Sequence, residues 1–362
     1  MPNVAPHVLQ EQASLLPFNT LRLDVKARYF AVVRSVADLE RLLKDPRVAE
    51  NPLLVLGGGS NILLSKDFDG VVLKMEISGR SVVYEDDEVV DLALGAGEDW
   101  PSVVEFAVAH GWGGIENLAL VPGTAGAAPV HNIACYGHNL HESLLWVESL
   151  DRNSGALCRF RVDECGLGYR TSIFKQELKG RHIVVRICLR LRKRPILNTS
   201  YQSRYESVAG ELARLGPPPY GVREVFNAIV AIRKRKLPDP ARVGTVGSVF
   251  MNPTVTVKQL QAIKALCPEI QSYPAEQLVY GDFSVDKDGD NARVKIPAAW
   301  LIEDMGWAGK QVGHCGVWKT QPLNIVNYGG ATPREYRDFL RTVQDAVYQR
   351  YGVRLDPEVV II

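Results

Sequence analysis

The sequence predicts an α+β protein. Short runs of apolar and β-branched residues, broken by turns, fill positions 20–191, and this spacing is typical of sheets. After Pro195 the pattern changes to helices joined by long connections. The chain has 362 residues, of which 46% are hydrophobic, so it can bury a large core, and its length indicates two or three domains.

Seven segments in the first part have the composition of strands. They are TLRLDV (20–25), YFAVV (29–33), PLLVLG (52–57), GVVLKM (70–75), SVVYE (81–85), VVDLAL (89–94) and HIVVRICLRL (182–191). Two helices are expected among them, one over 36–43 and one after Asp99. The second has Pro101 in its first turn and an apolar stripe that ends at Gly111. The stripe consists of Val103, Val104, Ala107 and Val108.

The second part contains two clear amphipathic helices. Pro238 ends the first after the basic residues 233–236, which either complement the helix C-terminus or contact a phosphate. The other begins at a predicted capping box, Thr332 to Glu335, and ends at Gly352. Their apolar positions are Val222, Val225, Phe226, Ile229 and Val230, and Tyr336, Phe339, Leu340 and Val343. A strand-like tail, VRLDPEVVII, closes the chain, and the Asp- and Gly-rich stretch 273–295 is predicted to be a surface insertion.

The charge balance argues against nucleic acid and membranes as partners. Lys plus Arg (42) nearly equals Asp plus Glu (41), so no global field attracts a polyanion. The first twenty residues contain no basic segment followed by an apolar one, and no segment approaches the roughly 18 apolar residues of a membrane span. We therefore expect a cytoplasmic protein.

The cysteines and histidines give little support for a metal site. Cys135, Cys158, Cys165, Cys188, Cys267 and Cys315 form no Cys-x-x-Cys pair, which favours reduced thiols. His131, His138 and His141 are close in sequence, but Gly137 and the lack of a nearby carboxylate pair favour a loop. No metal is expected.

Two loops of small residues are the strongest functional signal. The first, Gly57-Gly58-Gly59-Ser60-Asn61, follows a strand, but a strand-turn-strand pattern comes next, so a Rossmann turn is excluded by context. The second is Pro122-Gly123-Thr124-Ala125-Gly126-Ala127-Ala128-Pro129. Each loop alone is compatible with an ordinary turn. Together they offer unhindered backbone N–H groups that can hold a diphosphate without a basic side chain.

Eight motifs occur in a specific order along the chain. They are PFNT (17–20), GGGSN (57–61), ENLALVPGTAG (116–126), GYRTSIFK (168–175), KLPDP (236–240), GSVFMNP (247–253), WLIE (300–303) and DPEV (356–359). In this order they resemble the UDP-N-acetylenolpyruvoylglucosamine reductase family of bacterial peptidoglycan precursor synthesis, from about Leu16 to Ile362. The segment between Pro195 and Val222, with Tyr201 and Tyr205, resembles the longer subtype of that family.

The resemblance implies a domain organisation. A two-subdomain FAD-binding module of the vanillyl-alcohol oxidase type would precede a C-terminal α+β substrate-binding domain. The expected boundaries are 1–80 and 81–221 for the two FAD-binding subdomains, 222–352 for the substrate-binding domain and 353–362 for a strand returning to the active site. We expect one noncovalent FAD, NADPH as hydride donor, a sugar-nucleotide substrate and a monomer.

The resemblance also implies roles for individual residues. Arg170 would stabilise the substrate carboxylate as hydride arrives, since a guanidinium is permanently charged and bidentate. Ser248 would protonate the substrate, aided by Glu358. By sequence alone these three would be a surface ion pair, a turn serine and a strand-end carboxylate. The flavin would be bound by Gly57, Gly58, Gly59, Ser60, Asn61, Pro122, Gly123, Thr124, Gly126, Ala127, Tyr136 and Gly137, and the substrate by Tyr169, Tyr201, Lys236, Asn252 and Gln321.

Some positions depart from the family pattern. Met251, Thr245 and His131 stand where the family commonly has lysine, asparagine and glutamine. The missing lysine beside Ser248 leaves open how that serine is activated, and Tyr205 could replace Tyr201. Two alternatives also stay open. The protein could be an oxidase with flavin tethered through His131 or Cys135, or a flavin-binding module without turnover.

Overall fold

The computed structural model describes residues 8–202, 206–275 and 292–362, which form two compact units. Unit 1 contains 1–13, 27–58 and 69–235, and unit 2 contains 14–26, 59–68 and 236–362. The chain therefore passes twice into unit 2 before residue 70. Most of the predicted substrate-binding range lies in unit 2, whereas the helix that starts at Val222 belongs to unit 1 up to Arg235. The four-part division expected from the sequence stays a prediction.

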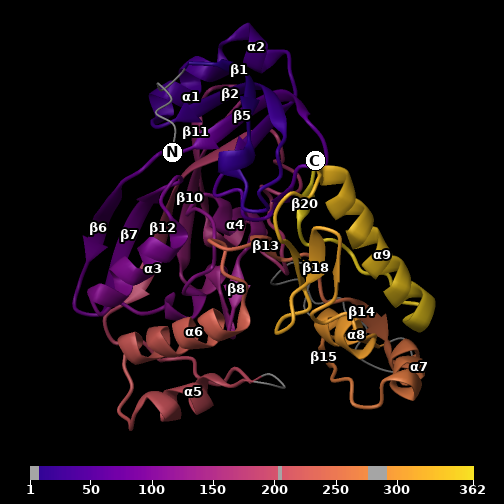
Figure 1. The fold of residues 1–362 in the computed structure, drawn as a ribbon. Coiled ribbons are helices and arrows are strands. Elements are labelled where there is room, and N and C mark those ends of the chain that lie inside the picture. The colour runs from indigo at the N-terminus through magenta and orange to yellow at the C-terminus, as the bar shows by residue number, and fades with distance from the viewer. Residues whose placement is uncertain (1–7, 203–205, 276–291) are drawn as a thin grey trace. The chain divides into compact units, whose positions relative to one another are not determined.

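Unit 1 contains two main sheets (Figure 1). The first has the order β1 (Gln10–Ser14), β2 (Lys26–Val33), β5 (Phe68–Met75), β3 (Leu53–Leu56), and its β3–β5 pair is parallel. The second is antiparallel, with the order β11 (Leu157–Arg161), β10 (Leu144–Asp151), β12 (His182–Arg192), β7 (Val89–Gly95), β6 (Arg80–Glu85). Strands β10 and β11 were not among the predicted strands.

Four helices of unit 1 begin after a residue whose side chain accepts a backbone N–H of the first turn. Helix α1 (Val36–Leu43) starts after Ser35, whose side chain accepts the N–H of Asp38. Helix α3 (Trp100–Ala109) starts after Asp99 and buries the predicted stripe. Helix α6 (Val222–Lys236) ends before Pro238, but it buries Ala228 and Ile232 where Phe226 and Val230 had been expected. The other helices and the short hairpin are α2 (Pro46–Ala49), α4 (Ala127–His131), α5 (Val208–Leu215), β8 (Ala134–Cys135) and β9 (His138–Asn139).

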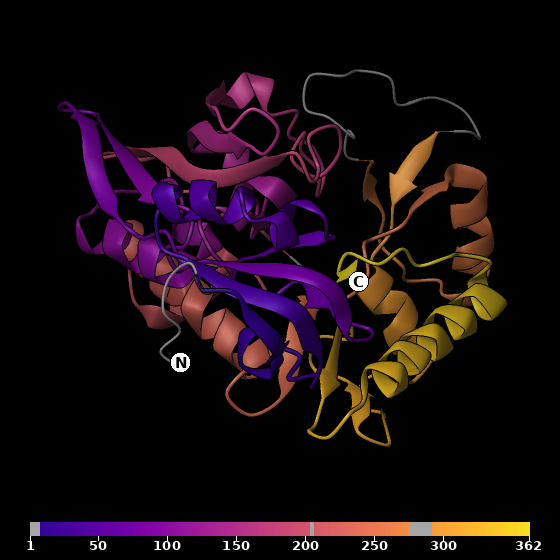
Figure 2. The ribbon, with the colours of Figure 1, turned by 90° about the horizontal axis from the view of Figure 1, so that it is seen from above.

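Unit 2 packs its helices and strands around one apolar core. A four-stranded sheet has the order β13 (Gly244–Ser248), β19 (Asn324–Asn327), β18 (Cys315–Val317), β17 (Gln311–Val312). A three-stranded sheet has the order β14 (Thr254–Thr256), β16 (Arg293–Lys295), β15 (Tyr273–Pro274). The helices are α7 (Val257–Leu266), α8 (Ala298–Asp304) and α9 (Pro333–Tyr351), and Figure 2 shows α9 as the long yellow helix of this unit.

The predicted strand over 20–25 is wrong. The side chain of Asn19 donates to the carbonyls of Leu15 and Leu23 and accepts the N–H of Leu23. These side-chain bonds close residues 15–23 into a loop, so the apolar pattern there serves burial and not strand pairing. Strand β2 begins only at Lys26.

Two predictions near the C-terminus are only partly right. Thr332 accepts the N–H of Glu335 as predicted, but the Glu335 carboxylate bonds His314, so no reciprocal capping box forms. In the predicted strand-like tail, only β20 (Val360–Ile361) is a strand, and it pairs in parallel with β4 (Ile62–Leu63).

Of the predicted insertion 273–295, residues 276–291 lie outside the described part of the chain, and the flanking strands β15 and β16 pair with each other.

Candidate functional site

The two small-residue loops meet within unit 1. A Cβ added to Gly58 would lie 2.9 Å from the Cα of Gly123, and one on Gly57 would lie 2.7 Å from Oγ1 of Thr124. Only glycine therefore allows the two backbones to approach this closely. Within the described residues, the N–H groups of Gly58 and Gly123 donate to no protein acceptor, which leaves them available to an anionic group.

The rest of the first loop lies in unit 2 and is fixed by the PFNT motif. Gly59 has φ +64, and a Cβ there would lie 2.0 Å from the carbonyl oxygen of Phe18. The backbone N–H of Thr20 donates to the carbonyl of Gly59, at 3.0 Å, and the N–H of Thr245 donates to the carbonyl of Thr20, at 2.9 Å. Thr20 thus links the glycine loop to β13, the strand that ends at Ser248. Ser60 is buried and Asn61 is half-buried in the same loop.

The second loop continues into two further predicted flavin residues. Pro122 is exposed, whereas Gly126 packs so closely on Ala96 that a Cβ would lie 2.5 Å from the alanine Cβ. Helix α4 starts at Ala127. Beyond α4, Tyr136 and Gly137 form a turn with φ values of 47 and 78.

Arg170 lies in a tight turn of unit 1. The residue has φ +56, its backbone carbonyl accepts the Lys175 ammonium at 2.8 Å, and its guanidinium donates to the carbonyl of Ala134 at 3.5 Å. The guanidinium also lies over the ring of Tyr169, at 5.4 Å from the centroid. These contacts orient a half-buried cation and connect it to the β8–β9 hairpin that contains the Tyr136–Gly137 turn.

His131, at the end of α4, is held neutral by its surroundings. Burial and the nearby charges of Lys175 and Arg170 lower the pKa of His131 to about 4. A neutral imidazole carries one donor and one acceptor, as an amide does. This agrees with the interpretation that His131 replaces a neutral hydrogen-bonding glutamine.

The lowered pKa of His131 predicts a pH-dependent stability. Between about pH 4 and 6.5 the unfolded chain binds a proton at this site that the folded chain does not, so the free energy of unfolding falls as the pH is lowered. We expect a loss of about 2 kcal/mol between pH 7 and pH 5 from this residue. In urea titrations, His131→Gln should lose less unfolding free energy between pH 7 and pH 5 than the unaltered protein. An equal loss in both proteins would contradict a lowered pKa of His131.

In unit 2, the segment that contains Glu358 pairs with the segment that follows Ser248. The backbone N–H of Glu358 donates to the carbonyl of Val249 at 2.8 Å, and the N–H of Met251 donates to the carbonyl of Asp356 at 2.9 Å. The amide of Asn61 donates to the carbonyl of Glu358 at 3.5 Å. Residues from three distant segments are therefore adjacent, although the sequence separates the serine and the glutamate by more than a hundred positions.

Ser248 itself is half-buried at the end of β13. Within the described part of the chain its hydroxyl makes no hydrogen bond to another residue. A hydroxyl in this situation can donate to a ligand without first breaking a protein contact. Position 251, where the family commonly has lysine, is a half-buried methionine.

Two predicted substrate residues of unit 2 lie on one small network. The backbone carbonyl of Lys236 accepts the indole N–H of Trp318 at 3.1 Å and the hydroxyl of Thr320 at 2.6 Å. Gln321 is the residue after Thr320, so its backbone lies close to that of Lys236. Asn252 is placed elsewhere in the unit, where its side-chain oxygen accepts the N–H of Ala298 at the start of α8.

Tyr201 belongs to unit 1 and packs edge-on against Tyr136, with ring centroids 5.0 Å apart. The predicted substrate tyrosine thus contacts a predicted flavin residue. Burial raises the pKa of Tyr136 well above its ordinary value, so its phenol stays protonated. Tyr205, the alternative, lies outside the described residues.

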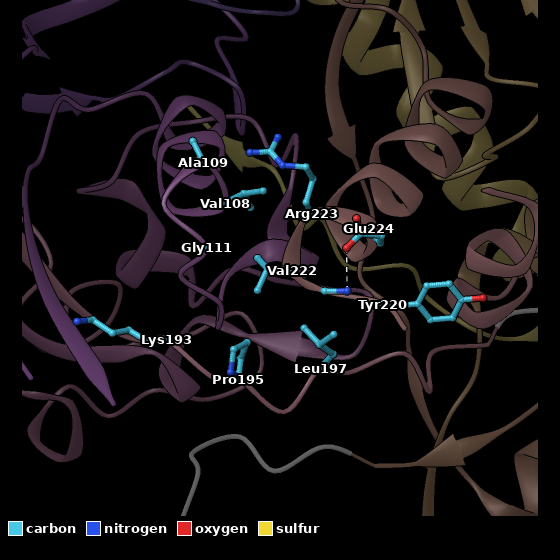
Figure 3. A pocket seen from close by; sticks show the side chains of 11 residues that line it. Val108, Ala109, Gly111, Lys193, Pro195, Leu197, Tyr220, Val222, Arg223 and Glu224 are labelled. Carbon is cyan, nitrogen blue, oxygen red and sulfur yellow. Dashed lines mark hydrogen bonds between the residues drawn. The ribbon is translucent and has the colours of Figure 1, made fainter. Parts of the chain in front are cut away.

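Metal-binding clusters, membrane-spanning helices and cavities are the remaining candidate features of the described chain. In residues 8–202, 206–275 and 292–362, no cluster of three His, Cys, Asp or Glu side chains could hold a metal ion, and all six cysteines are free thiols. The helices of these ranges include none that is long and apolar enough to cross a membrane. A cavity of about 480 Å³ lies between the end of α3 and the start of α6 (Figure 3), but it is lined by none of the predicted site residues.

Three residues that hydrogen-bond segments with predicted site residues were not predicted from the sequence. Thr20 joins the first glycine loop to β13, Asn117 bonds two loops of unit 1, and Arg233 donates to the sulfur of Cys135 and the carbonyl of Leu120. Thr20 and Asn117 lie inside motifs that had been noted, PFNT and ENLALVPGTAG. Arg233 lies in the basic run 233–236, and the sequence pattern does not indicate which of these four residues makes tertiary hydrogen bonds.

Two family models and several curated relatives match the chain. Residues 27–161 match the family model "FAD binding domain", and residues 239–362 match "UDP-N-acetylenolpyruvoylglucosamine reductase, C-terminal domain". A protein named UDP-N-acetylenolpyruvoylglucosamine reductase from Burkholderia ambifaria is 40% identical over 359 residues, which cover 96% of this chain and 97% of the relative. One of the same name from Amoebophilus asiaticus is 39% identical over 354 residues, covering 98% and 99%.

A solved structure shows the same fold. The UDP-N-acetylenolpyruvylglucosamine reductase of Thermus caldophilus has a TM-score of 0.65 and 22% identity, and the match covers 98% of this chain and 99% of that one. The fold and the two domain matches define the class, an α+β flavoprotein oxidoreductase in which an FAD-binding domain is followed by a separate C-terminal domain. With relatives of about 40% identity over nearly its full length, the chain belongs to the UDP-N-acetylenolpyruvoylglucosamine reductase family.

Proposed function

We propose that the protein reduces the enolpyruvyl ether of UDP-N-acetylglucosamine enolpyruvate to UDP-N-acetylmuramate, with NADPH as reductant. The observation that carries the proposal is the pairing of residues 356–359 with 249–251, which brings Glu358 beside the segment of Ser248 in a chain of this family. Ser248 and Glu358, the residues of the proposed proton-transfer step, both belong to unit 2, which supports the proposal. A cytoplasmic location and a monomeric state stay predictions.

The small-residue loops fit the diphosphate of FAD. Gly58 and Gly123 present N–H groups that have no protein acceptor, and any side chain at Gly57 or Gly58 would fill the space between the loops. Such N–H groups bind anionic oxygens without a counter-cation. When bound, FAD would accept hydride from NADPH and deliver it to the substrate.

The chain's own residues would control the charge and the proton. Arg170 would hold the substrate carboxylate, where negative charge grows as hydride adds to the methylene carbon. Ser248 would donate a proton to C2 of the substrate. A free hydroxyl is a weak acid, so we propose that Glu358 supports the proton transfer in a hydrogen-bonded relay.

One anaerobic experiment tests the function. NADPH should bleach the yellow flavin of the purified protein, and UDP-N-acetylglucosamine enolpyruvate should restore the colour without oxygen. Bleaching that only oxygen reverses would support the oxidase alternative. Absence of any bleaching would support a flavin-binding module without turnover.

We expect the flavin to be noncovalent. The proposed chemistry requires no tether, and Cys135 already accepts a hydrogen bond from Arg233 at 3.0 Å. Acid precipitation should therefore release all the pigment as FAD into the supernatant. Pigment that stays with the pellet would indicate a bond to His131 or Cys135.

Lys236→Ala should weaken substrate binding and leave folding intact. The contacts that Trp318 and Thr320 make with Lys236 use its backbone carbonyl, which alanine retains. A charge-assisted contact of the lost ammonium with a substrate phosphate would raise the Michaelis constant. Thermal unfolding and steady-state kinetics measure the two effects.

Lys234→Ala is the matched control, because Lys234 is an exposed lysine in the same helical turn. We expect its Michaelis constant to be unchanged. Equal Michaelis constants in Lys236→Ala and Lys234→Ala would indicate that the basic residues 233–236 have only a structural role at the helix end.

A further inference from the structure

We propose that Asn117 is a positioning residue for the substrate tyrosine: one buried amide holds the segment of Tyr201 against the Tyr136–Gly137 turn. The inference deepens the proposed function and rests on the role given there to Tyr201. Asn117 has no part in the resemblance-based site. All the contacts that support its role lie within unit 1.

The amide nitrogen of Asn117 joins two segments that are distant in sequence. It donates to the carbonyl of Tyr136 at 2.8 Å and to the carbonyl of Asn198 at 2.9 Å, spanning 19 and 81 positions. The residue is 2% exposed, so solvent cannot readily replace either bond. A buried carbonyl that loses its donor costs more than the bond itself contributes.

The two bonded segments also contact each other directly. The side-chain amide of Asn198 donates to the carbonyl of Gly137 at 2.8 Å, and the rings of Tyr136 and Tyr201 meet edge to face. A Cβ on Gly137 would lie 3.2 Å from the Asn198 nitrogen, so the turn fits closely against that side chain. Tyr136 and Gly137, which both have positive φ, thus accept hydrogen bonds from Asn117 and Asn198.

The network continues to Tyr201 through a local turn. The side-chain oxygen of Asn198 accepts the N–H of Ser200 at 3.2 Å and its hydroxyl at 2.8 Å. These bonds set the backbone that leads into Tyr201. Because Asn117 fixes Asn198 and Tyr136 together, both the backbone before Tyr201 and the ring on which it packs depend on one amide.

The proposal predicts a coupled effect on ligand binding. Asn117→Ala should raise the dissociation constant of UDP-N-acetylmuramate about tenfold, because Tyr201 then loses part of its preferred position. Tyr201→Ala should weaken binding to a similar or greater degree. In the double variant the two effects should not multiply, since residues that act through one contact are non-additive.

The test is calorimetric titration of the oxidised, flavin-loaded protein with UDP-N-acetylmuramate, without NADPH, on the four proteins of this cycle. The inference would be overturned if the effects of the two substitutions on the dissociation constant multiplied in the double variant. An unchanged dissociation constant in Asn117→Ala would also overturn it. If Tyr201→Ala binds normally, the role of Tyr201 and the inference both fail. Failure of the proposed function itself is distinguishable, because the unaltered protein would then not bind this ligand.

Two further variants separate positioning from general loss of stability. Asn327→Ala also removes a buried asparagine whose amide donates to a backbone carbonyl, that of Leu21, but in unit 2. It should lower the melting temperature without the non-additive change in ligand affinity. If Asn117→Ala does not fold, Asn198→Ala removes the bond to Gly137 from the same network and should show the same coupling with Tyr201→Ala.

Discussion

Ser248→Ala should separate the two halves of the reaction. NADPH should reduce the flavin at nearly the normal rate, because the proposed proton transfer follows hydride delivery. Reoxidation by the enolpyruvyl substrate should slow by roughly 10² to 10⁴, the range that a positioned general acid supplies. This corresponds to about 3 to 5 kcal/mol of transition-state stabilisation.

The fold should tolerate this change well. In the described part of the chain the Ser248 hydroxyl has no protein partner, so alanine leaves no donor or acceptor unsatisfied. Stopped-flow absorbance of the flavin, recorded anaerobically for each half, is the measurement. Ser65→Ala is the control, since this half-buried serine of the same unit donates its hydroxyl to the backbone carbonyl of Ile362. Slower NADPH oxidation with normal substrate reduction in Ser248→Ala would refute the assignment of the proton donor.

Arg170→Met should impair the same half-reaction by a different route. Hydride addition places negative charge on the substrate carboxylate, and without the guanidinium that charge has no counter-ion. We expect a loss of roughly 10² to 10³ in the rate of flavin reoxidation, comparable to removal of one oxyanion-stabilising donor. The φ of +56 at this position is equally unfavourable for arginine and methionine, so the substitution adds no backbone strain.

Two further variants sharpen this test. Arg170→Lys keeps the charge without the bidentate fork, so its rate should lie between those of Arg170→Met and the unaltered protein. Arg161→Met, which removes an exposed arginine paired with Asp163 in the same unit, should have no effect. A normal reoxidation rate in Arg170→Met would show that Arg170 has only a structural role beside Tyr169.

The helices were largely predictable because their signals are local. Ser35 and Asp99 cap α1 and α3, Pro238 follows the end of α6, and Gly352 follows the end of α9. Each of these residues acts within about one turn of its own position. The glycine loop was also correctly separated from a Rossmann turn, because β4 and β5 follow β3.

Errors arose where a side chain competed with strand pairing. Residues 20–25 have the composition of a strand, yet the amide of Asn19 bonds the backbone on both sides and closes a loop. In the tail, residues 356–359 bond with the segment after Ser248, and only β20 pairs as a strand. Composition records the preference of a segment for burial, but it does not record which partner satisfies its backbone.

The sequence by itself determined the α+β class, the family and the two loops that offer backbone N–H groups, and it led to the proposed residues of the chemistry. Only the tertiary structure decided that Gly58 touches Gly123, that the segment of Glu358 pairs beside Ser248, and that Asn117 bonds Asn198, 81 positions away. The reason is physical: capping, turn and strand preferences depend on near neighbours in the chain. Contacts between distant segments form only when burial and backbone hydrogen bonding are satisfied for the whole unit at once.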